Sequence, residues 1–184
     1  MTDLTSTPAA GFALAQGDGE ILWWESQLFT IKSSAGGLGL VDSYLEAGSE
    51  PPMHIHTRED EFIYVLDGEI TAYVGDVSLK AGAGGFVYMP RFVPHTFAVD
   101  GAGSAHALIM YTPSGFERVF WEHRTADYLP GVPGPTAARH DLAVLGQAFE
   151  DAGLIITGRH PRETLIASGT VHKESETAAA PVTT

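Results

Sequence analysis

Short stretches of strand-forming residues, separated at regular intervals by turn-forming residues, make up the middle of the chain. The stretches are rich in Val, Ile, Phe and Tyr. The turn signals between them are Gly36-Gly37, Gly48, Asp67-Gly68, Gly75-Asp76, residues 82–85, Asp100-Gly101 and residues 113–115. Because short strands at this spacing are typical of β-sandwiches and barrels, the pattern predicts an all-β fold.

The segment 61–66 shows the alternation of side chains in one predicted strand. One face would carry Glu61, Ile63 and Val65, and the other Phe62, Tyr64 and Leu66. Because both faces are largely apolar, we expect the strand to be covered on both sides. Asp67-Gly68 follows it and is typical of a two-residue hairpin turn, which would lead into a second strand over 69–74.

Towards the C-terminus the hydrophobic spacing becomes helical. Ser114 stands three residues before Glu117, the spacing of a capping box, and this pair predicts a short helix through 116–123. An apolar stripe at helical spacing predicts a second helix over 138–153, which Gly153 would end.

The length of 184 residues suits one well-cored domain with flanking segments. Residues 16–115 would form the barrel, and residues 116–167 a C-terminal helical extension. Residues 1–15 and 168–184 have few large apolar side chains, so we expect a mobile N-terminal segment and a disordered tail.

Charge and composition narrow the range of partners. The formal net charge is -13, with 23 acidic residues against 10 Lys and Arg, which disfavours nucleic acid and anionic membranes as partners. The absence of cysteine excludes disulfides and thiolate metal sites. Because no stretch approaches the ~20 consecutive apolar residues of a membrane span, we expect a soluble, cytoplasmic protein.

The candidate chemistry lies in four residues that interrupt the strand pattern. His54 and His56 are two apart, so they would share one face of a strand. Glu61 follows at an odd offset and can face them only if the polar stretch 57–60 turns the chain and resets the alternation. His95 begins a later predicted strand. Three imidazoles and one carboxylate would form a mixed nitrogen and oxygen site for one divalent transition metal ion.

These residues carry a resemblance to the cupin superfamily. The first cupin motif, G-x5-H-x-H-x4-E-x6-G, is matched at every fixed position by Gly48, His54, His56, Glu61 and Gly68. The second motif is matched by Gly84, Pro90 and His95, with Phe92 and Val99 in place of its usual glycine and asparagine. The resemblance covers residues 35–115. It implies a cupin jelly-roll β-barrel, also called a double-stranded β-helix, with the metal inside.

Within the cupins, a single barrel with this helical extension is similar to the bacterial quercetinase-like flavonol 2,4-dioxygenases. That resemblance implies an enzyme that opens the central ring of a flavonol with O₂ and releases carbon monoxide. His54, His56, Glu61 and His95 would bind nickel, manganese, cobalt or iron, with copper and zinc as alternatives. Glu61 would also act as the catalytic base.

Other interpretations of the same site remain open at this stage. A non-redox cupin, such as an isomerase, lyase or cyclase, or a non-catalytic small-molecule-binding cupin would use the same metal ligands. By alternation from the ligands we expect Ile63, Val65 and Phe97 to face an aromatic substrate. The adjacent Trp23 and Trp24, with the apolar strand faces and the helices, predict a homodimer.

Overall fold

The computed structural model describes residues 11–48, 50–101, 103–135 and 140–162. The strands are β1 (Glu20–Trp24), β2 (Gln27–Ala35), β3 (Leu38–Glu46), β4 (Met53–His56), β5 (Asp60–Asp67), β6 (Glu69–Val74), β7 (Val77–Gly82), β8 (Phe86–Met89), β9 (His95–Val99), β10 (Ser104–Thr112), β11 (Ala126–Asp127) and β12 (Leu154–Gly158). The helices are α1 (Glu117–Glu122) and α2 (Leu142–Ala152).

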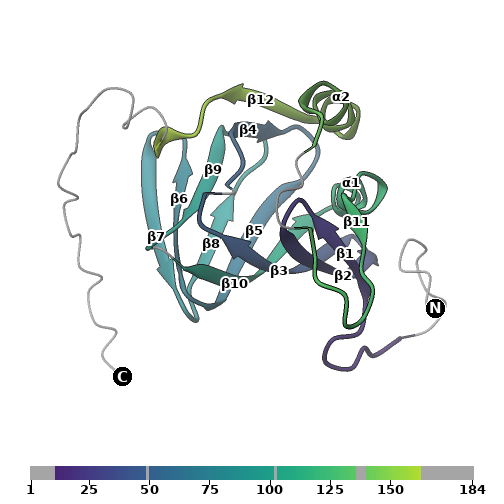
Figure 1. The fold of residues 1–184 in the computed structure, drawn as a ribbon. Helices are drawn as coiled ribbons and strands as arrows, with labels where there is room; N and C mark the ends of the chain where they lie inside the picture. Colours follow the sequence, from purple (N-terminus) through teal and green to yellow (C-terminus); the bar gives the residue numbers. More distant parts are fainter. Residues whose placement is uncertain (1–10, 49, 102, 136–139, 163–184) are drawn as a thin grey trace.

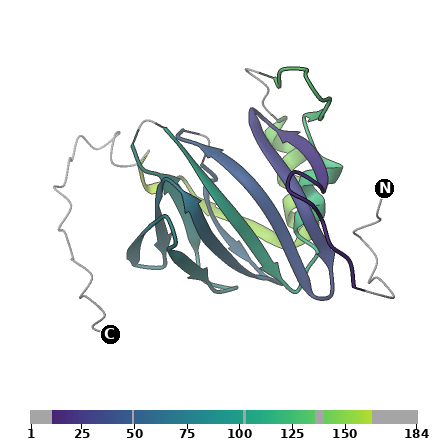
Figure 2. The same ribbon diagram turned by 90° about the horizontal axis from the view of Figure 1, so that it is seen from below.

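Alternating apolar side chains bring the strands into two facing antiparallel sheets (Figures 1 and 2). One sheet has the strand order β11-β1-β2-β3-β10-β5-β8, and the other β12-β4-β9-β6-β7. Their inner faces bury one hydrophobic core, in which Leu22, Val41, Ile63, Val65 and Ile70 are fully buried. This two-sheet barrel confirms the predicted all-β jelly-roll fold.

The predicted hairpin at Asp67-Gly68 is wrong. β5 pairs with β10 and β8 in the larger sheet, whereas β6 pairs with β7 and β9 in the smaller one. Gly68 has a φ of 81°, as a tight turn needs, but the chain changes sheets there instead of doubling back. The two-residue hairpin turn lies further on, at Gly75-Asp76 between β6 and β7.

The outer face of β5 is open to solvent in the single chain, in contrast to the predicted cover on both sides. Tyr64 and Leu66 are 38% and 41% exposed. Phe62 stacks on Phe86 and Tyr88 of the neighbouring edge strand β8, with ring centroids 5.8 and 5.1 Å apart. Only the inner face of β5 belongs to the core.

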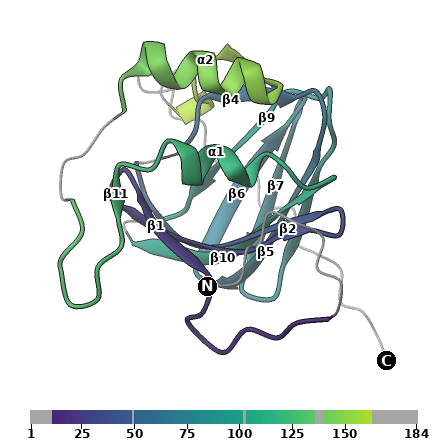
Figure 3. The ribbon, with the colours of Figure 1, turned by 90° about the vertical axis from the view of Figure 1, so that its right-hand side faces the viewer.

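Both helices lie on the same side of the barrel, where α1 contacts β1, β2, β3 and α2 (Figures 1 and 3). The predicted capping box does not form: the carboxylate of Glu117 accepts a hydrogen bond from the backbone N–H of Gly115 at 2.9 Å, and α1 has no side-chain cap. α2 is shorter than predicted and ends before Gly153, whose φ of 91° favours glycine.

The C-terminal extension also contributes a strand that the sequence pattern did not predict. β12 pairs antiparallel with β4, with Leu154 opposite His56 and Ile156 opposite His54. Residues 1–10 of the predicted N-terminal segment, residues 163–167 of the extension and the predicted tail 168–184 lie outside the described residues. Among the helices that the structure does describe, none is long and apolar enough to cross a membrane.

Candidate metal centre

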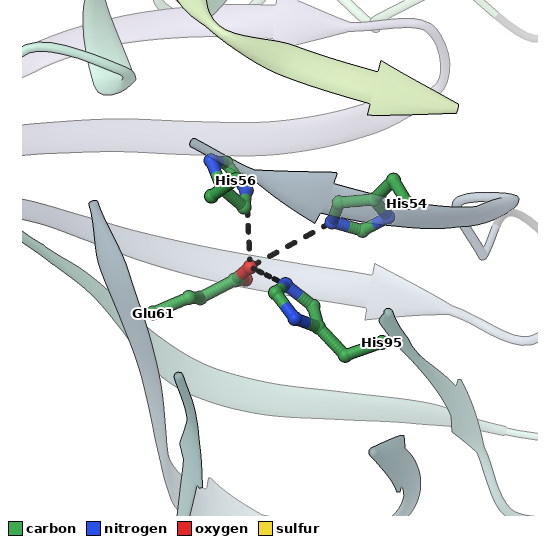
Figure 4. A group of neighbouring side chains, drawn as sticks. All are labelled: His54, His56, Glu61 and His95. Carbon is green, nitrogen blue, oxygen red and sulfur yellow. Dashed lines mark hydrogen bonds and ion pairs between the residues drawn. The ribbon is translucent and has the colours of Figure 1, made fainter. Parts of the chain in front are cut away.

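Four side chains from three strands converge inside the barrel. His54 and His56 lie on β4, Glu61 on β5 and His95 on β9 (Figure 4). The Nε2 atoms of His95, His56 and His54 lie 3.2, 3.3 and 3.8 Å from Oε2 of Glu61. All four side chains are buried, and one ligand atom from each lies within 4.8 Å of all the others. This spacing and donor set fit a bound metal ion.

A break between β4 and β5 lets Glu61 face the histidines. β4 ends at His56, the chain bends through 57–59, and β5 begins at Asp60. The bend resets the two-residue alternation, so Glu61 points inward as predicted. Thr57, the first residue of the bend, is held from outside the barrel. Its backbone N–H and its hydroxyl both donate to the carbonyl oxygen of Gly153, each at 2.8 Å.

An ion pair joins the segments that carry Glu61 and His95. Arg91 donates to both carboxylate oxygens of Asp60, from Nη2 at 2.8 Å and from Nε at 3.1 Å. The Arg91 guanidinium lowers the pKa of Asp60 below its ordinary value. Because Asp60 precedes Glu61 directly and Arg91 precedes His95 by four residues, this two-point contact fixes the two ligand-bearing strands relative to each other.

Backbone carbonyl groups orient two of the three imidazoles. Nδ1 of His54 lies 2.8 Å from the carbonyl oxygen of Pro52, and Nδ1 of His95 lies 2.8 Å from that of Val93. A carbonyl oxygen can only accept, so each Nδ1 carries a proton, which leaves Nε2 as the nitrogen that a metal ion can bind. The Nε2 atoms of both rings are directed at Glu61, so a metal ion bound there would meet nitrogen and oxygen ligands together.

The third imidazole faces a side-chain carboxylate instead of a backbone carbonyl group. Nδ1 of His56 lies 3.5 Å from Oε2 of Glu59, and neither atom has a hydrogen-bond partner among the described residues. Both residues are almost completely buried. The polar stretch that contains Glu59 would ordinarily be a solvated turn, so no local sequence pattern indicates this contact.

Burial and mutual charge set the protonation of the cluster. Burial raises the pKa of Glu61, but the imidazoles of His54, His56 and His95 outweigh it and hold this pKa well below its ordinary value. Burial lowers the pKa of His54. Burial also opposes the charged form of His56, but the carboxylates of Glu59 and Glu61 raise its pKa to about 9. The carboxylate is thus ionised, as a metal ligand must be.

The cluster opens into a cavity of about 460 Å³ between the barrel and the C-terminal helices. His54, His56 and Glu61 lie in its wall. Its remaining wall is mainly apolar and includes aromatic side chains from β1, β9, β10, α1 and α2, which are Trp24, Phe97, Tyr111, Phe120 and Phe149. Glu25, Gln27 and Glu50 add polar groups, and no Lys or Arg of the described chain lines it.

The substrate-facing residues expected from the sequence are distributed between cavity and core. Phe97 lines the cavity, whereas Ile63 and Val65 are completely buried in the barrel core and do not belong to its lining. Gln27 and Trp24 also line the cavity and were not expected to do so. No local signal could reveal them, because the wall that they form exists only after the N-terminal strands and the C-terminal helices meet.

Comparisons with known proteins agree with the ligand pattern. The family model described as cupin domain matches residues 42–111. Quercetin 2,3-dioxygenase of Bacillus subtilis (strain 168) is 26% identical over 106 residues, which cover 54% of this chain and 32% of that protein. The chain therefore spans about a third of the length of this curated relative.

Similar solved structures include an RmlC-like cupin from Shewanella frigidimarina, with a TM-score of 0.49, 20% identity and coverage of 58% of this chain and 93% of that one. KdgF from a Halomonas species gives a TM-score of 0.46 and 16% identity, covering 50% and 85% of the two chains. A cupin-superfamily sugar phosphate isomerase from Silicibacter pomeroyi gives a TM-score of 0.43 and 19% identity, covering 47% of this chain and 59% of that one. The family match contains all four clustered residues, and we conclude that residues 42–111 of the chain are a cupin domain.

Proposed function

We propose that the protein is a metal-dependent, quercetinase-like dioxygenase that cleaves a flavonol or a related enolisable aromatic compound with O₂. The observation that carries the proposal is the joining of two features in one cavity. The buried cluster of three histidines and Glu61 opens directly onto aromatic walls. The similarity to a protein named quercetin 2,3-dioxygenase supports the same chemistry.

His54, His56, Glu61 and His95 would hold one divalent transition metal ion per chain. Nitrogen and oxygen donors without sulfur suit nickel, manganese, cobalt and iron, with copper and zinc as alternatives. Such an ion supplies Lewis acidity, which favours the deprotonated form of an enolic hydroxyl bound beside it.

Glu61 would take the proton of that hydroxyl. As a fully ionised ligand it is a weak base, because the surrounding positive charge holds its pKa low. When the substrate oxygen becomes anionic, it replaces the charge of Glu61 in the cluster, and the carboxylate becomes a better proton acceptor. Glu61 would therefore be a ligand at rest and a base during turnover. The deprotonated, electron-rich ring is the species that reacts with O₂.

The charges in the cavity favour an uncharged aromatic substrate over a phosphorylated one. Glu25, Glu50 and Glu61 line the cavity, and no Lys or Arg of the described residues balances them there. A phosphate group would lose its hydration and meet carboxylates instead of guanidinium or ammonium groups. A planar aromatic compound would instead bury its rings against side chains such as Trp24 and Phe116.

Oxygen consumption with a panel of flavonols tests the proposal. Protein purified without a histidine tag is loaded separately with nickel, manganese, cobalt and iron, and O₂ uptake and carbon monoxide release are recorded. We expect stoichiometric uptake and release with at least one metal, and neither in a His56→Ala control. Tight flavonol binding without O₂ uptake under all metals would contradict the dioxygenase and support a non-redox or binding cupin.

A further inference from the structure

Gln27, the first residue of β2, is a buried polar side chain in the wall of the cavity. It pairs with Trp24 across the β1–β2 turn and is only 5% exposed. Its Oε1 accepts a hydrogen bond from the backbone N–H of Glu46 at 3.2 Å. This bond fixes the orientation of the amide, because an N–H can donate only to the oxygen end.

The nitrogen end of the same amide has no partner. With Oε1 held by Glu46, Nε2 presents two N–H groups, and it donates no hydrogen bond to any described residue. Buried amide groups are nearly always paired, so an unpaired donor that lines a cavity suggests a ligand atom as its partner.

The carboxylates of Glu25 and Glu50, which also line the cavity, cannot donate a hydrogen bond to a ligand as Gln27 can. Glu50 uses both oxygens to accept backbone N–H groups, from Gly48 at 2.9 Å and from Val99 at 3.1 Å. Oε1 of Glu25 lies 3.4 Å from Nδ1 of His140. Ionised carboxylates also only accept hydrogen bonds, whereas Gln27 offers a donor.

Gln27 and Glu61 line the same cavity from different strands of the larger sheet, in which β3 and β10 lie between β2 and β5. A ligand that contacts both residues must therefore carry two separate polar groups, one for each.

We propose that Gln27 is a specificity residue whose Nε2 donates a hydrogen bond to an oxygen substituent on an outer ring of the aromatic substrate. The enolic oxygen on the central ring would lie at the cluster of His54, His56, Glu61 and His95. This inference rests on the proposed function and adds to it a narrower substrate class: uncharged flavonols that carry a hydroxyl or ether oxygen on an outer ring.

Two flavonols separate this role from general binding. Quercetin and 3-hydroxyflavone share the 3-hydroxy-4-keto group, but only quercetin carries hydroxyls on its outer rings. Their dissociation constants are measured anaerobically on metal-loaded wild type, Gln27→Met and Gln147→Met. Gln147 lies on exposed α2 surface outside the cavity and is the matched control. We expect Gln27→Met to weaken the binding of quercetin by about 3- to 10-fold, which corresponds to one hydrogen bond. The dissociation constant of 3-hydroxyflavone should stay unchanged.

Equal weakening of both flavonols, or no change for quercetin, would show that Gln27 only supports the β1–β2 turn, and would overturn the inference. If neither flavonol bound wild type, the proposed function itself would fall. Gln27→Glu covers the case in which Gln27→Met does not fold, because it keeps an acceptor for the Glu46 N–H. This variant must weaken a quercetin derivative whose outer-ring hydroxyls are methyl ethers, since those oxygens only accept; unchanged binding would refute the donor role.

Discussion

Glu61 combines two roles that make opposite demands on one carboxylate. As a ligand it must stay ionised, and as a base it must accept a proton. Glu61→Gln keeps the shape and one oxygen donor but cannot take a proton. We therefore expect the variant to retain much of its metal on the three histidines and to lose about 10²–10⁴-fold in single-turnover rate.

Metal content and rate must be measured on the same preparation of the Glu61→Gln variant. A variant that reacted at the wild-type rate would refute the base role. A variant without metal would show that Glu61 is an essential ligand, and its lost activity would then say nothing about proton transfer.

Glu59 is expected to strengthen metal binding through His56. Among the described residues, its carboxylate is the only side-chain group that lies beside Nδ1 of a cluster histidine, at 3.5 Å from His56. A carboxylate there fixes the ring and makes Nε2 a better donor. Glu59→Gln should therefore weaken the affinity for Co²⁺ or Ni²⁺ by about 10–100-fold, as measured by competition with a chelator.

An exposed carboxylate on β5 offers a control for that effect. Asp67→Asn removes the same charge from the last residue of β5, whose side chain is exposed and lies outside the cluster. We expect it to change metal affinity far less than Glu59→Gln. Equal losses in the two variants would mean that net charge, and not orientation of His56, sets the affinity.

At the residue scale, the sequence predicted the four clustered residues, but not Glu59, which lies beside His56, or Gln27, which lines the same cavity. His54, His56 and Glu61 lie within one short segment, so local alternation and a turn suffice to bring them together. Glu59 and Gln27 look like ordinary turn and strand residues. Their burial depends on segments that approach from elsewhere in the chain, which no local pattern records.

At the scale of elements, the strands were predictable and their partners were not. Gly68 has the backbone conformation of a tight turn, so the turn itself was correctly placed. Whether β5 and β6 then pair depends on where their apolar faces find cover, and each finds it in a different sheet. β12 was missed for a related reason: it is short, largely exposed and stabilised by its pairing with β4.

The junction between α2 and β12 is expected to control the stability of the ligand-bearing segment. Gly153 has a φ of 91°, and a Cβ there would lie 2.8 Å from Oγ1 of Thr57 and 3.0 Å from Nε of Arg58. Gly153→Ala should therefore destabilise the protein by roughly 1–3 kcal/mol, the cost of a strained backbone position. Thermal unfolding of metal-free protein measures the change.

Gly146, which lies inside α2, provides the contrast to Gly153. A Cβ added there would meet no atom within 4 Å, and its backbone is helical. Gly146→Ala should leave stability unchanged or raise it by up to about 1 kcal/mol, because alanine favours the helix. A loss of stability equal to that of Gly153→Ala would contradict the view that the α2–β12 junction is the critical contact.

At the scale of the whole molecule, the cavity depends on both ends of the described chain. The barrel supplies the cluster, β1 and β2 supply Trp24 and Gln27, and the helices supply Phe116 and Phe149. Both tryptophans pack within the chain. Trp24 packs edge-on against Phe120, with ring centroids 4.9 Å apart, and Trp23 lies against Gly134. The predicted homodimer must therefore rest on another surface.

The outer face of β5 and β8 is the surface on which we expect that homodimer to form. Phe86 and Tyr88 are 57% and 47% exposed on an edge strand, beside the exposed Tyr64. Exposed aromatic edge strands promote association, which a closed two-fold contact would limit to a dimer. Light scattering at micromolar concentration should report a dimer for wild type and a monomer for Phe86→Lys. Val144→Lys, at an equally exposed position on α2, should stay dimeric. A monomeric wild type would rule out the assembly, and a dimeric Phe86→Lys would place the contact elsewhere.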